Sequence, residues 1–454
     1  MSQAASQRRE RRHLHFDALV QLARHRFDKL PDQRRCPGFS LTDTLMAGLA
    51  LFCLKDPSLL AFQRRTLDHN LRSVFGLRGI PSDTQMRTIL DDVGPERVRP
   101  LFKDIFRQVQ RGKVLEDYLF LDYYYLVALD GVEYFTSKKV HCQHCMTRHH
   151  SNGEVSYYHQ LLGAAVVHPD FPEVIPLAPE PIQRRDGQQK NDCERNSARR
   201  WLKQFRKDHP HLNIIVIEDA LSSNAPHIRD LQTYHCHFIL GVKPGDHQYL
   251  FEELIKRAEA DQVGKLEVTD PETGIQHSYL FAHGVSLNEA NQQVQVNVLH
   301  YVQTDPDGTS HEWTWVTDLE LTVTNVPQVA RAGRARWRIE NETFNTLKNQ
   351  GYHFEHNYGH GEKNLAVVMA LLMMLAFLID QVQQKCNPLF RAAWKKKGPK
   401  CALWEAMRNL FASFEVSSMR EIYEGIAYGY KRPRLKTLID QAQGNVGEGA
   451  DDTS

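Results

Sequence analysis

The pattern of apolar and polar positions changes twice along the chain. Residues 1–112 carry apolar residues at helical spacing and lack strand-like alternation. Within them, Ser82 or Asp83 can cap a helix whose apolar face begins at Met86. From Tyr118 onwards the sequence becomes rich in aromatic and β-branched residues, which are typical of strands. The pattern therefore predicts a helical N-terminal region followed by a sheet.

Strand-like and helix-like segments alternate after the first change. Apolar runs predict strands at 118–129, 157–167, 212–217 and 237–242. The segments between the later strands have helical period, at 191–207 and 225–231. This order predicts an α/β layer built on a mixed sheet.

A second change separates residues 262–325 from the α/β layer. Four short segments there alternate with a two-residue period, and the turn signals Asp270-Pro-Glu-Thr-Gly and Asp305-Pro-Asp-Gly divide them. They predict an inserted unit of antiparallel strands. Helical period returns at 326–439. Its longest apolar run, 365–379, is shorter than the roughly 18–20 residues that span a bilayer and predicts a buried helix.

Composition places the chain among large intracellular proteins. Its 454 residues are 41% hydrophobic and 24% charged, which is ordinary for a globular protein of about two to four domains. The net charge of +1 excludes binding of polyanions by bulk charge, but basic residues cluster near 8–12, 395–397 and 431–436. Eight scattered cysteines and an N-terminus without an apolar core indicate neither a disulfide scaffold nor a signal peptide. We expect a cytoplasmic protein that does not bind membranes.

Three acidic residues, far apart in the chain, are candidates for one catalytic site. Asp130 and Asp219 each follow an apolar run, so each is expected at the end of a buried strand, where ligands bind in open α/β sheets. Glu340 lies in a segment of helical period. Taken singly, each aspartate is more often a turn former. Together, the three carboxylates can hold two Mg²⁺ or Mn²⁺ ions, an arrangement that cuts and joins phosphodiesters.

Basic residues flank Glu340 in the sequence. Arg336 precedes it by one helical turn, Arg338 lies between them, and Lys348 follows eight residues later. Cations on each side of a metal-binding carboxylate suit a phosphate backbone lying across the site. The alternative for this segment alone is a surface helix laced with ion pairs, which leaves the two aspartates unexplained.

The segment around Glu340 resembles the DDE transposases of bacterial insertion sequences. One group of these enzymes has the signature Tyr-x2-Arg-x3-Glu-x6-Lys, and Arg336 and Glu340 match its central part. The tyrosine position falls on Gly333, and the lysine appears one residue late, at Lys348. The residues that follow, 345–361, continue the resemblance. These departures leave the metal chemistry untouched and concern the contacts to DNA.

The resemblance implies a ribonuclease-H-like core with a β insertion before the final glutamate. It implies that Asp130, Asp219 and Glu340 bind two Mg²⁺ ions, cleave DNA at the element ends and transfer the 3′-hydroxyls into target DNA. Double-stranded DNA, at the terminal inverted repeats and at the target, would be the partner of a homodimer in the bacterial cytoplasm, associated with the nucleoid. Trp313 or Trp315 could stack on a flipped base near the cleaved end, although a strand tryptophan more often belongs to the core.

The resemblance and the patterns together divide the chain into six units. They are a helical DNA-binding region (1–112), the first part of the catalytic core (113–261), the inserted β subdomain (262–325), the final core helices with Glu340 (326–385), a helical C-terminal region (386–443) and a disordered tail (444–454). The tail is expected to be disordered because it is polar and rich in glycine and aspartate.

Cys142 and Cys145 have the two-residue spacing of a zinc knuckle. Five histidines and a further cysteine are candidates for the other ligands: His141, His144, His149, His150, His159 and Cys193. Because one Cys-x2-Cys pair supplies only half of a tetrahedral site, the remaining ligands stay open. We favour a structural zinc ion over free thiols, and it would pin the loop after the strand that carries Asp130.

Three other functions remain open at this point. A nuclease on the same core would cut DNA without joining it. An inactive descendant of a transposase would only bind DNA, although the intact set of three acids argues against it. A structural zinc protein would lack salt-sensitive DNA binding altogether.

Overall fold

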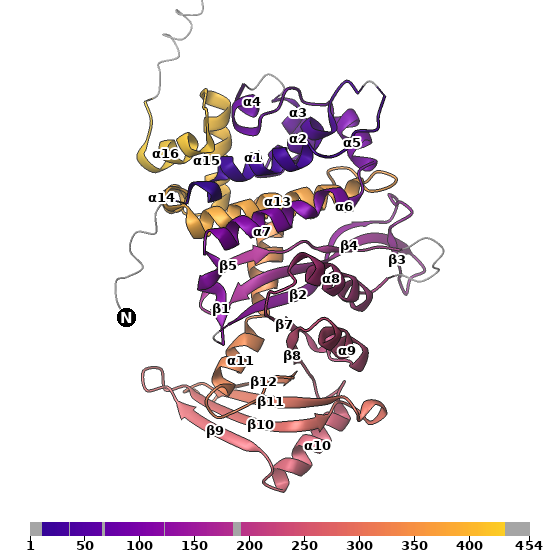
Figure 1. Cartoon of the computed structure of the whole chain (residues 1–454), viewed down its shortest axis with the longest axis vertical. Coiled ribbons are helices and arrows are strands. Elements are labelled where there is room, and N and C mark those ends of the chain that lie inside the picture. The colour runs from indigo at the N-terminus through magenta and orange to yellow at the C-terminus, as the bar shows by residue number, and fades with distance from the viewer. Residues whose placement is uncertain (1–10, 36, 66–68, 122, 185–191, 432–454) are drawn as a thin grey trace, which may run out of the picture.

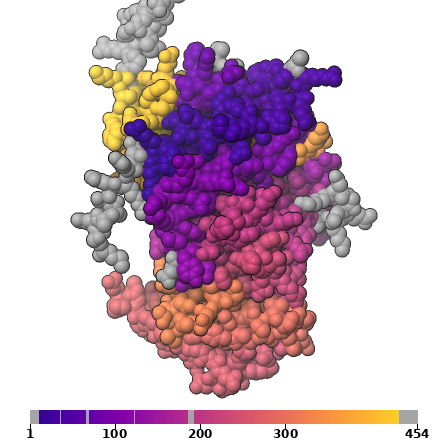
Figure 2. All heavy atoms as spheres, in the orientation of Figure 1, coloured from indigo at the N-terminus to yellow at the C-terminus, as the bar shows by residue number. Residues whose placement is uncertain are grey.

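The chain forms a helical end, a central mixed sheet and an antiparallel end along its long axis (Figure 1). The computed structural model describes residues 11–35, 37–65, 69–121, 123–184 and 192–431. The tail predicted at 444–454 lies outside this part of the chain, as do several basic residues near both termini. Segments from the start and the finish of the chain meet at the helical end, where the indigo and yellow surfaces adjoin (Figure 2).

The central sheet has the strand order of a ribonuclease-H-like core. Strand β2 (Tyr124–Ser137) pairs antiparallel with β4 (Val155–His168), which in turn pairs antiparallel with β5 (Phe171–Pro176). On its other side, β2 pairs in parallel with β7 (Ile214–Glu218), and β7 pairs in parallel with β8 (His237–Gly241). In the order β5-β4-β2-β7-β8, β4 alone runs against the others. The predicted fold class is therefore confirmed.

The inserted strands extend this sheet rather than forming a separate one. They are β9 (Gly264–Thr269), β10 (Gln276–Ser286), β11 (Gln295–Thr304) and β12 (Ser310–Thr317). Each pairs antiparallel with the next, and β12 then pairs with β8. The predicted turns end at Gly274 and Gly308, which have φ angles of 72° and 86°, a region that glycine enters without steric cost. Short strands β1 (Leu119–Phe120), β3 (Met146–His149) and β6 (Glu180–Ile182) complete the sheet.

Helices flank the sheet, and all of them except α10 lie where the sequence predicts helices. They are α8 (Glu194–Asp208), α9 (Ala225–Thr233), α10 (Gln248–Glu259), α11 (Val326–Arg334), the π-helix η5 (Ile339–Phe344) and α12 (Asn345–Asn349). Helix α8 buries an apolar stripe of Trp201, Leu202 and Phe205. Helix α8 contacts β2, β4 and β6, whereas η5 contacts β2, β4 and β5. Both elements therefore lie close to the strand that carries Asp130.

The helical end combines helices from both termini of the chain. The N-terminal members are α1 (Phe16–Phe27), α2 (Leu41–Cys53), α3 (Leu59–Gln63), α4 (His69–Phe75), α5 (Asp83–Asp91), α6 (Pro95–Val98) and α7 (Pro100–Arg111). The C-terminal members are α13 (Leu365–Cys386), α14 (Pro388–Lys397), α15 (Lys400–Ser413) and α16 (Met419–Tyr428). Ser82 caps α5 in a reciprocal capping box with Gln85.

Helix α13 is the central helix of this end. By length and composition alone it could cross a membrane, but 94% of its most apolar 18-residue window is buried inside the protein. It packs against α1, α2, α5, α6 and α7 and also against β5. The prediction of a buried helix at 365–379 is confirmed, and α13 joins the helical end to the central sheet.

Candidate active site: four carboxylates at the central sheet

Asp130 and Asp219 lie on neighbouring parallel strands. In the β2–β7 ladder Ala128 is opposite Ile217, so two further residues on each strand bring Asp130 and Asp219 to the same edge, where parallel strands lie about 4.8 Å apart. The prediction that Asp130 ends its strand is wrong, because β2 continues past it and Asp130 is opposite Gly163 in β4. What ends beyond Ala128 is the pairing of β2 with β7.

Glu340 is linked to Asp130 through Arg336. The guanidinium Nη1 donates to Glu340 Oε1 at 2.8 Å and to Asp130 Oδ2 at 3.3 Å. Only 13% of the Arg336 side chain is exposed, and its Cζ atom lies 4.8 Å from the centre of the Trp337 ring. Two carboxylates separated by about half of the chain therefore flank one cation.

Close packing next to Asp130 holds the segment of Glu340 in place. A Cβ atom on Gly163 would lie 2.7 Å from the Phe344 ring, so the absence of a side chain in β4 lets this ring reach the sheet. Arg338 donates to the Pro169 carbonyl at 2.9 Å and pairs with Glu342, which ties the segment to the β4–β5 turn. Glu340 itself lies in a π-helix, a conformation that is frequent at functional sites.

A fourth carboxylate, Glu194, completes the cluster and was not predicted from the sequence. It is the first residue of α8 and accepts a hydrogen bond from Gln160 Nε2 at 2.7 Å. A Cβ atom on Gly131 would lie 2.0 Å from Glu194 Oε1, so the carboxylate lies against the backbone directly after Asp130. In sequence, an acidic residue in the first turn of a helix indicates only a favourable dipole interaction, which is why Glu194 gave no signal.

The four acids concentrate negative charge at a partly buried place. Burial raises the pKa of Asp130 to about 7; Arg336 opposes this rise, and the charges of Glu340 and Glu194 add to it. Burial also raises the pKa of Glu194, and the charge of Asp219 adds to that rise. One guanidinium does not balance four carboxylates. The set of hard oxygen donors therefore suits divalent cations such as Mg²⁺ or Mn²⁺.

The two candidate tryptophans have different environments. Trp315 is 5% exposed, and a Cβ atom on Gly333 would lie 2.4 Å from its ring. The indole therefore fills the space where the transposase signature has a tyrosine, and it is part of the packing between β12 and α11. Trp313 is only half-buried, with its ring stacked on Tyr301 and the Arg334 Cζ atom 4.6 Å from its ring centre. Of the two, Trp313 is the one that a base can reach.

We expect Trp315→Ala to lower the free energy of unfolding by about 3–5 kcal/mol, because it removes a large buried ring. Trp313→Ala is the matched control from the same strand and should cost less than half as much, since its ring is half-buried. Urea denaturation followed by circular dichroism measures both. Equal losses for the two variants would contradict this assignment.

The other residues predicted to contact DNA, Lys348 and Arg338, bind protein groups instead. Lys348 Nζ pairs with Glu355 Oε1 at 2.8 Å, while Arg338 holds the π-helix to the β4–β5 turn. Trp337, which was not among the predicted site residues, lies between Arg336 and Arg338 and is 51% exposed. In the sequence, only its position between Arg336 and Arg338 could have indicated a role for Trp337 in the site.

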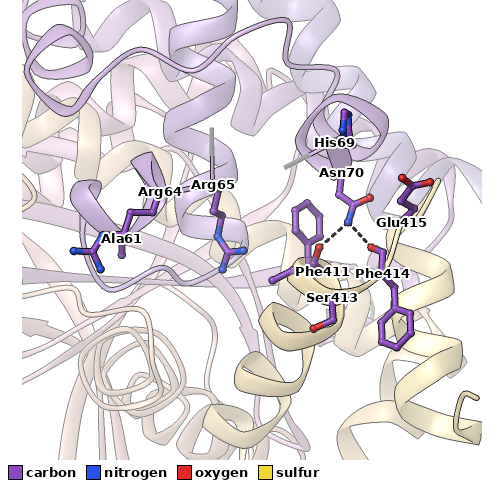
Figure 3. Close-up of a pocket in the computed structure, with 10 residues that line it drawn as sticks. Ala61, Arg64, Arg65, His69, Asn70, Phe411, Ser413, Phe414 and Glu415 are labelled. Atoms are coloured by element: carbon purple, nitrogen blue, oxygen red, sulfur yellow. Dashed lines mark hydrogen bonds between the residues drawn. The ribbon is translucent and has the colours of Figure 1, made fainter. Parts of the chain in front are cut away.

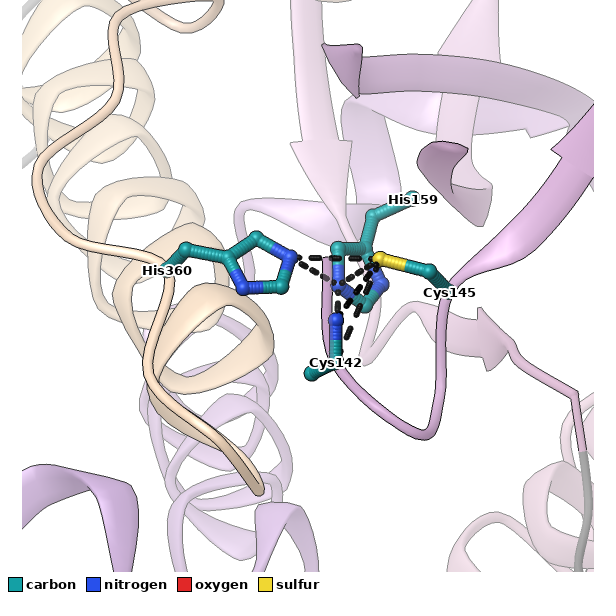
Figure 4. Close-up of side chains that lie close together, drawn as sticks. All are labelled: Cys142, Cys145, His159 and His360. Carbon is teal, nitrogen blue, oxygen red and sulfur yellow. Dashed lines mark hydrogen bonds between the residues drawn. The ribbon is translucent and has the colours of Figure 1, made fainter. Parts of the chain in front are cut away.

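A second cluster consists of Cys142, Cys145, His159 and His360 (Figure 4). All four side chains are buried, and one ligand atom of each lies within 4.8 Å of the others. The cysteines and His159 were among the predicted candidates, but His360 was not, because 215 residues separate it from Cys145. Within the described residues, Cys193 is exposed and does not belong to this cluster.

A groove of about 540 Å³ lies in the helical end, between α3, α4 and α15 (Figure 3). Asn70 Nδ2 donates to the carbonyls of Phe411 and Phe414 at 2.6 Å each, which joins the N-terminal and C-terminal helices. Arg65, on the groove wall, pairs with Asp56 at 2.8 Å. The groove is therefore part of the interface between these helices and contains none of the four carboxylates.

Comparison with known proteins finds a similarity in the central part of the chain. A profile of the family described as "Transposase DDE domain" matches residues 181–378, a range that contains Asp219 and Glu340 and begins after Asp130. No curated protein matches the chain. Among solved structures, the cryo-EM structure of a piggyBac transposase synaptic complex with hairpin DNA matches with 13% identity and a TM-score of 0.38, over 97% of this chain and 86% of that one. Residues 181–378 are therefore similar to the transposase DDE domain, in agreement with the resemblance of the motif around Glu340.

Proposed function

We propose that this protein is a transposase that cleaves DNA at the ends of an insertion sequence and joins the 3′ ends to target DNA by two-metal phosphoryl transfer. The match of residues 181–378 to the transposase DDE domain supports DNA transposition in general. The observation that carries the more specific proposal is the placement of the acids. Asp130 and Asp219 each lie two residues beyond the paired residues Ala128 and Ile217 of adjacent parallel strands. Arg336 links Asp130 to Glu340.

In this proposal Asp130, Asp219 and Glu340 hold two Mg²⁺ or Mn²⁺ ions. Bound ions would lower the pKa of the attacking hydroxyl and stabilise the leaving oxygen. The protein contributes orientation, because Asp130 is fixed within a paired strand and Glu340 in a helix that packs on the same strands. Arg336 fills the gap between the two carboxylates, and on loading of the site we expect its guanidinium to turn towards a DNA phosphate.

The DNA contacts in this proposal come from aromatic and basic residues of the motif around Glu340 and of the inserted strands. The exposed ring of Trp337 next to Arg336 and the accessible ring of Trp313 offer faces on which unpaired bases can stack. Arg338 and Lys348 would act through the segment that they hold in place. Double-stranded DNA with terminal inverted repeats is the proposed substrate, and two copies of the chain would bring the two ends together in the bacterial cytoplasm. The helical region of residues 1–112 is the proposed DNA-docking unit.

A strand-transfer assay tests this proposal against the alternative of a nuclease that does not join. Pre-cut element ends with free 3′-hydroxyls are incubated with the protein, Mg²⁺ and a target plasmid. Joined products are expected. Cleavage of uncut ends without any joining of pre-cut ends would favour the nuclease, and neither reaction would favour a DNA-binding protein without catalysis.

We expect Glu194→Gln to lower Mg²⁺-dependent cleavage by about 10–100-fold, the range found when a group that supports metal ligands is altered. The reason is that Glu194 adds charge beside Asp130 and Asp219. A gel assay with labelled element ends measures the rate, and filter binding measures DNA affinity, which should change little. Glu252→Gln, an exposed acid on α10, is the control. An unchanged cleavage rate for Glu194→Gln would remove this residue from the site.

A further inference from the structure

We propose that Cys142, Cys145, His159 and His360 bind one structural Zn²⁺ ion, and that this ion fastens the segment following Glu340 to the strand pair that carries Asp130. The inference is independent of the proposed function, because it rests on a cluster separate from the carboxylates. It completes a site for which the sequence supplied only half of the ligands. It also assigns the zinc ion a structural role, which is to join these two parts of the chain.

The spacing of the four ligand atoms fits a tetrahedral zinc site. Zn–S bonds of about 2.3 Å and Zn–N bonds of about 2.0–2.1 Å place tetrahedral ligands roughly 3.8 Å apart for S–S, 3.5 Å for S–N and 3.3 Å for N–N. The Sγ atoms of Cys142 and Cys145 are 4.0 Å apart. His159 Nε2 lies 3.5 and 3.4 Å from these two atoms. His360 Nε2 lies 3.2 Å from Cys145 Sγ and 3.1 Å from His159 Nε2.

Hydrogen bonding orients His360 as a metal ligand. Its Nδ1 donates to the Gly361 carbonyl at 2.9 Å, so Nε2, the atom that faces the cluster, carries the lone pair. The three other ligand atoms converge on the same point from buried side chains. Two thiols and two neutral imidazoles could hydrogen-bond only in pairs, whereas one cation at the centre contacts all four atoms at once. Two thiolates and two imidazoles are the ligands of a closed structural zinc site.

The four ligands come from three separate parts of the chain. Cys142 and Cys145 lie in the connection from β2 to β3, His159 lies in β4, and His360 lies between α12 and α13. The ring of Phe135, in β2, lies 4.5 Å from that of His360, which places the cluster over the sheet. Zinc would therefore join the β2–β3 connection and β4 to the segment that leads from Glu340 into α13.

The backbone around His360 is shaped for this position. Gly359 and Gly361, on each side of it, have φ angles of 132° and 67°, which side chains disfavour. A Cβ atom on Gly361 would also lie 2.2 Å from Asp91 Oδ1. Asp91, at the end of α5, accepts the backbone N–H groups of residues 362–365 and so caps α13. The segment is fastened at one point to the helical end and, through His360, at a second point to the sheet.

Elemental analysis of the purified full chain tests the zinc site directly. About one zinc ion per chain is expected, and it should fall to near zero in Cys145→Ser and in His360→Ala. Cys193→Ser and His356→Ala are matched controls, an exposed cysteine and an exposed histidine of the same segment as His360. Both controls should retain the metal. A parent protein without zinc, or His360→Ala with a full complement, would overturn the proposal.

A second measurement on the parent protein keeps the test independent of variants that fold poorly. Replacement of the metal by Co²⁺ should produce the visible absorption of a tetrahedral thiolate site together with a sulfur-to-cobalt charge-transfer band. Removal of the metal by a chelator should lower the Tm, and added Zn²⁺ should restore it. Absence of the cobalt spectrum, or an unchanged Tm after complete metal removal, would contradict a structural zinc ion at this site.

Discussion

Asp130→Asn, Asp219→Asn and Glu340→Gln should each lower Mg²⁺-dependent cleavage of element ends by roughly 10³-fold or more. Loss of a single group that stabilises charge in a transition state already costs about 10²–10³-fold, and each of these substitutions removes a proposed ligand of the ions themselves. DNA binding should change little, because the phosphate contacts come from cationic side chains. A time course of cleavage and a titration of labelled DNA measure the two effects separately.

Glu342→Gln is the matched control for Glu340→Gln. It lies two residues away in the same π-helix and pairs with Arg338 rather than with Arg336. It should retain most of the cleavage activity, and circular dichroism should show both variants folded. Full cleavage by any one of the three acid variants would exclude that residue from the catalytic set.

The second large effect is expected in the helical end, at a buried ion pair. Lys55 Nζ contacts the Asp380 carboxylate in α13, and their side chains are 0% and 4% exposed. Lys55 also donates to the Cys53 carbonyl at 3.0 Å, and Tyr352 donates to Asp380 at 2.7 Å. Lys55→Met would leave the Asp380 charge buried beside a single hydroxyl donor. We expect it to lower the free energy of unfolding by about 3–5 kcal/mol, the usual cost of breaking a buried pair on one side.

The double variant Lys55→Met/Asp380→Leu distinguishes a buried charge from lost packing. Removal of both charges leaves no unpaired ion, so the double variant should be more stable than Lys55→Met alone. Urea denaturation of the parent, both single variants and the double variant gives the coupling free energy. Additive losses would show that Lys55 and Asp380 contribute independently, which would contradict the importance of the pair.

The local elements of this protein could be predicted from the sequence because they follow short-range periodicity. The turns at Gly274 and Gly308, the cap at Ser82 and the buried helix α13 each leave a signal within a few residues. The continuity of the inserted strands with the core could not be predicted. It depends on the pairing of β12 with β8, which lie far apart in the chain.

The candidate site could be predicted in part for the same reason. Asp130, Asp219 and Glu340 stand out because of the apolar runs and the arginine motif beside them. Glu194 and His360 have no such local signal, since their partners are brought together only by tertiary packing. The end of β2 was misplaced because Asp-Gly usually marks a turn, whereas here antiparallel pairing with β4 carries the strand through it.

Three acids that are far apart in the chain are proposed to form one site for a pair of divalent cations. Anomalous diffraction from crystals of the protein with element-end DNA and Mn²⁺ would locate these cations. Two manganese peaks are expected about 3.5–4 Å apart, with carboxylate oxygens of Asp130, Asp219 and Glu340 as their ligands. Manganese bound elsewhere, or an Asp219 or Glu340 carboxylate that reaches neither peak, would contradict this proposal.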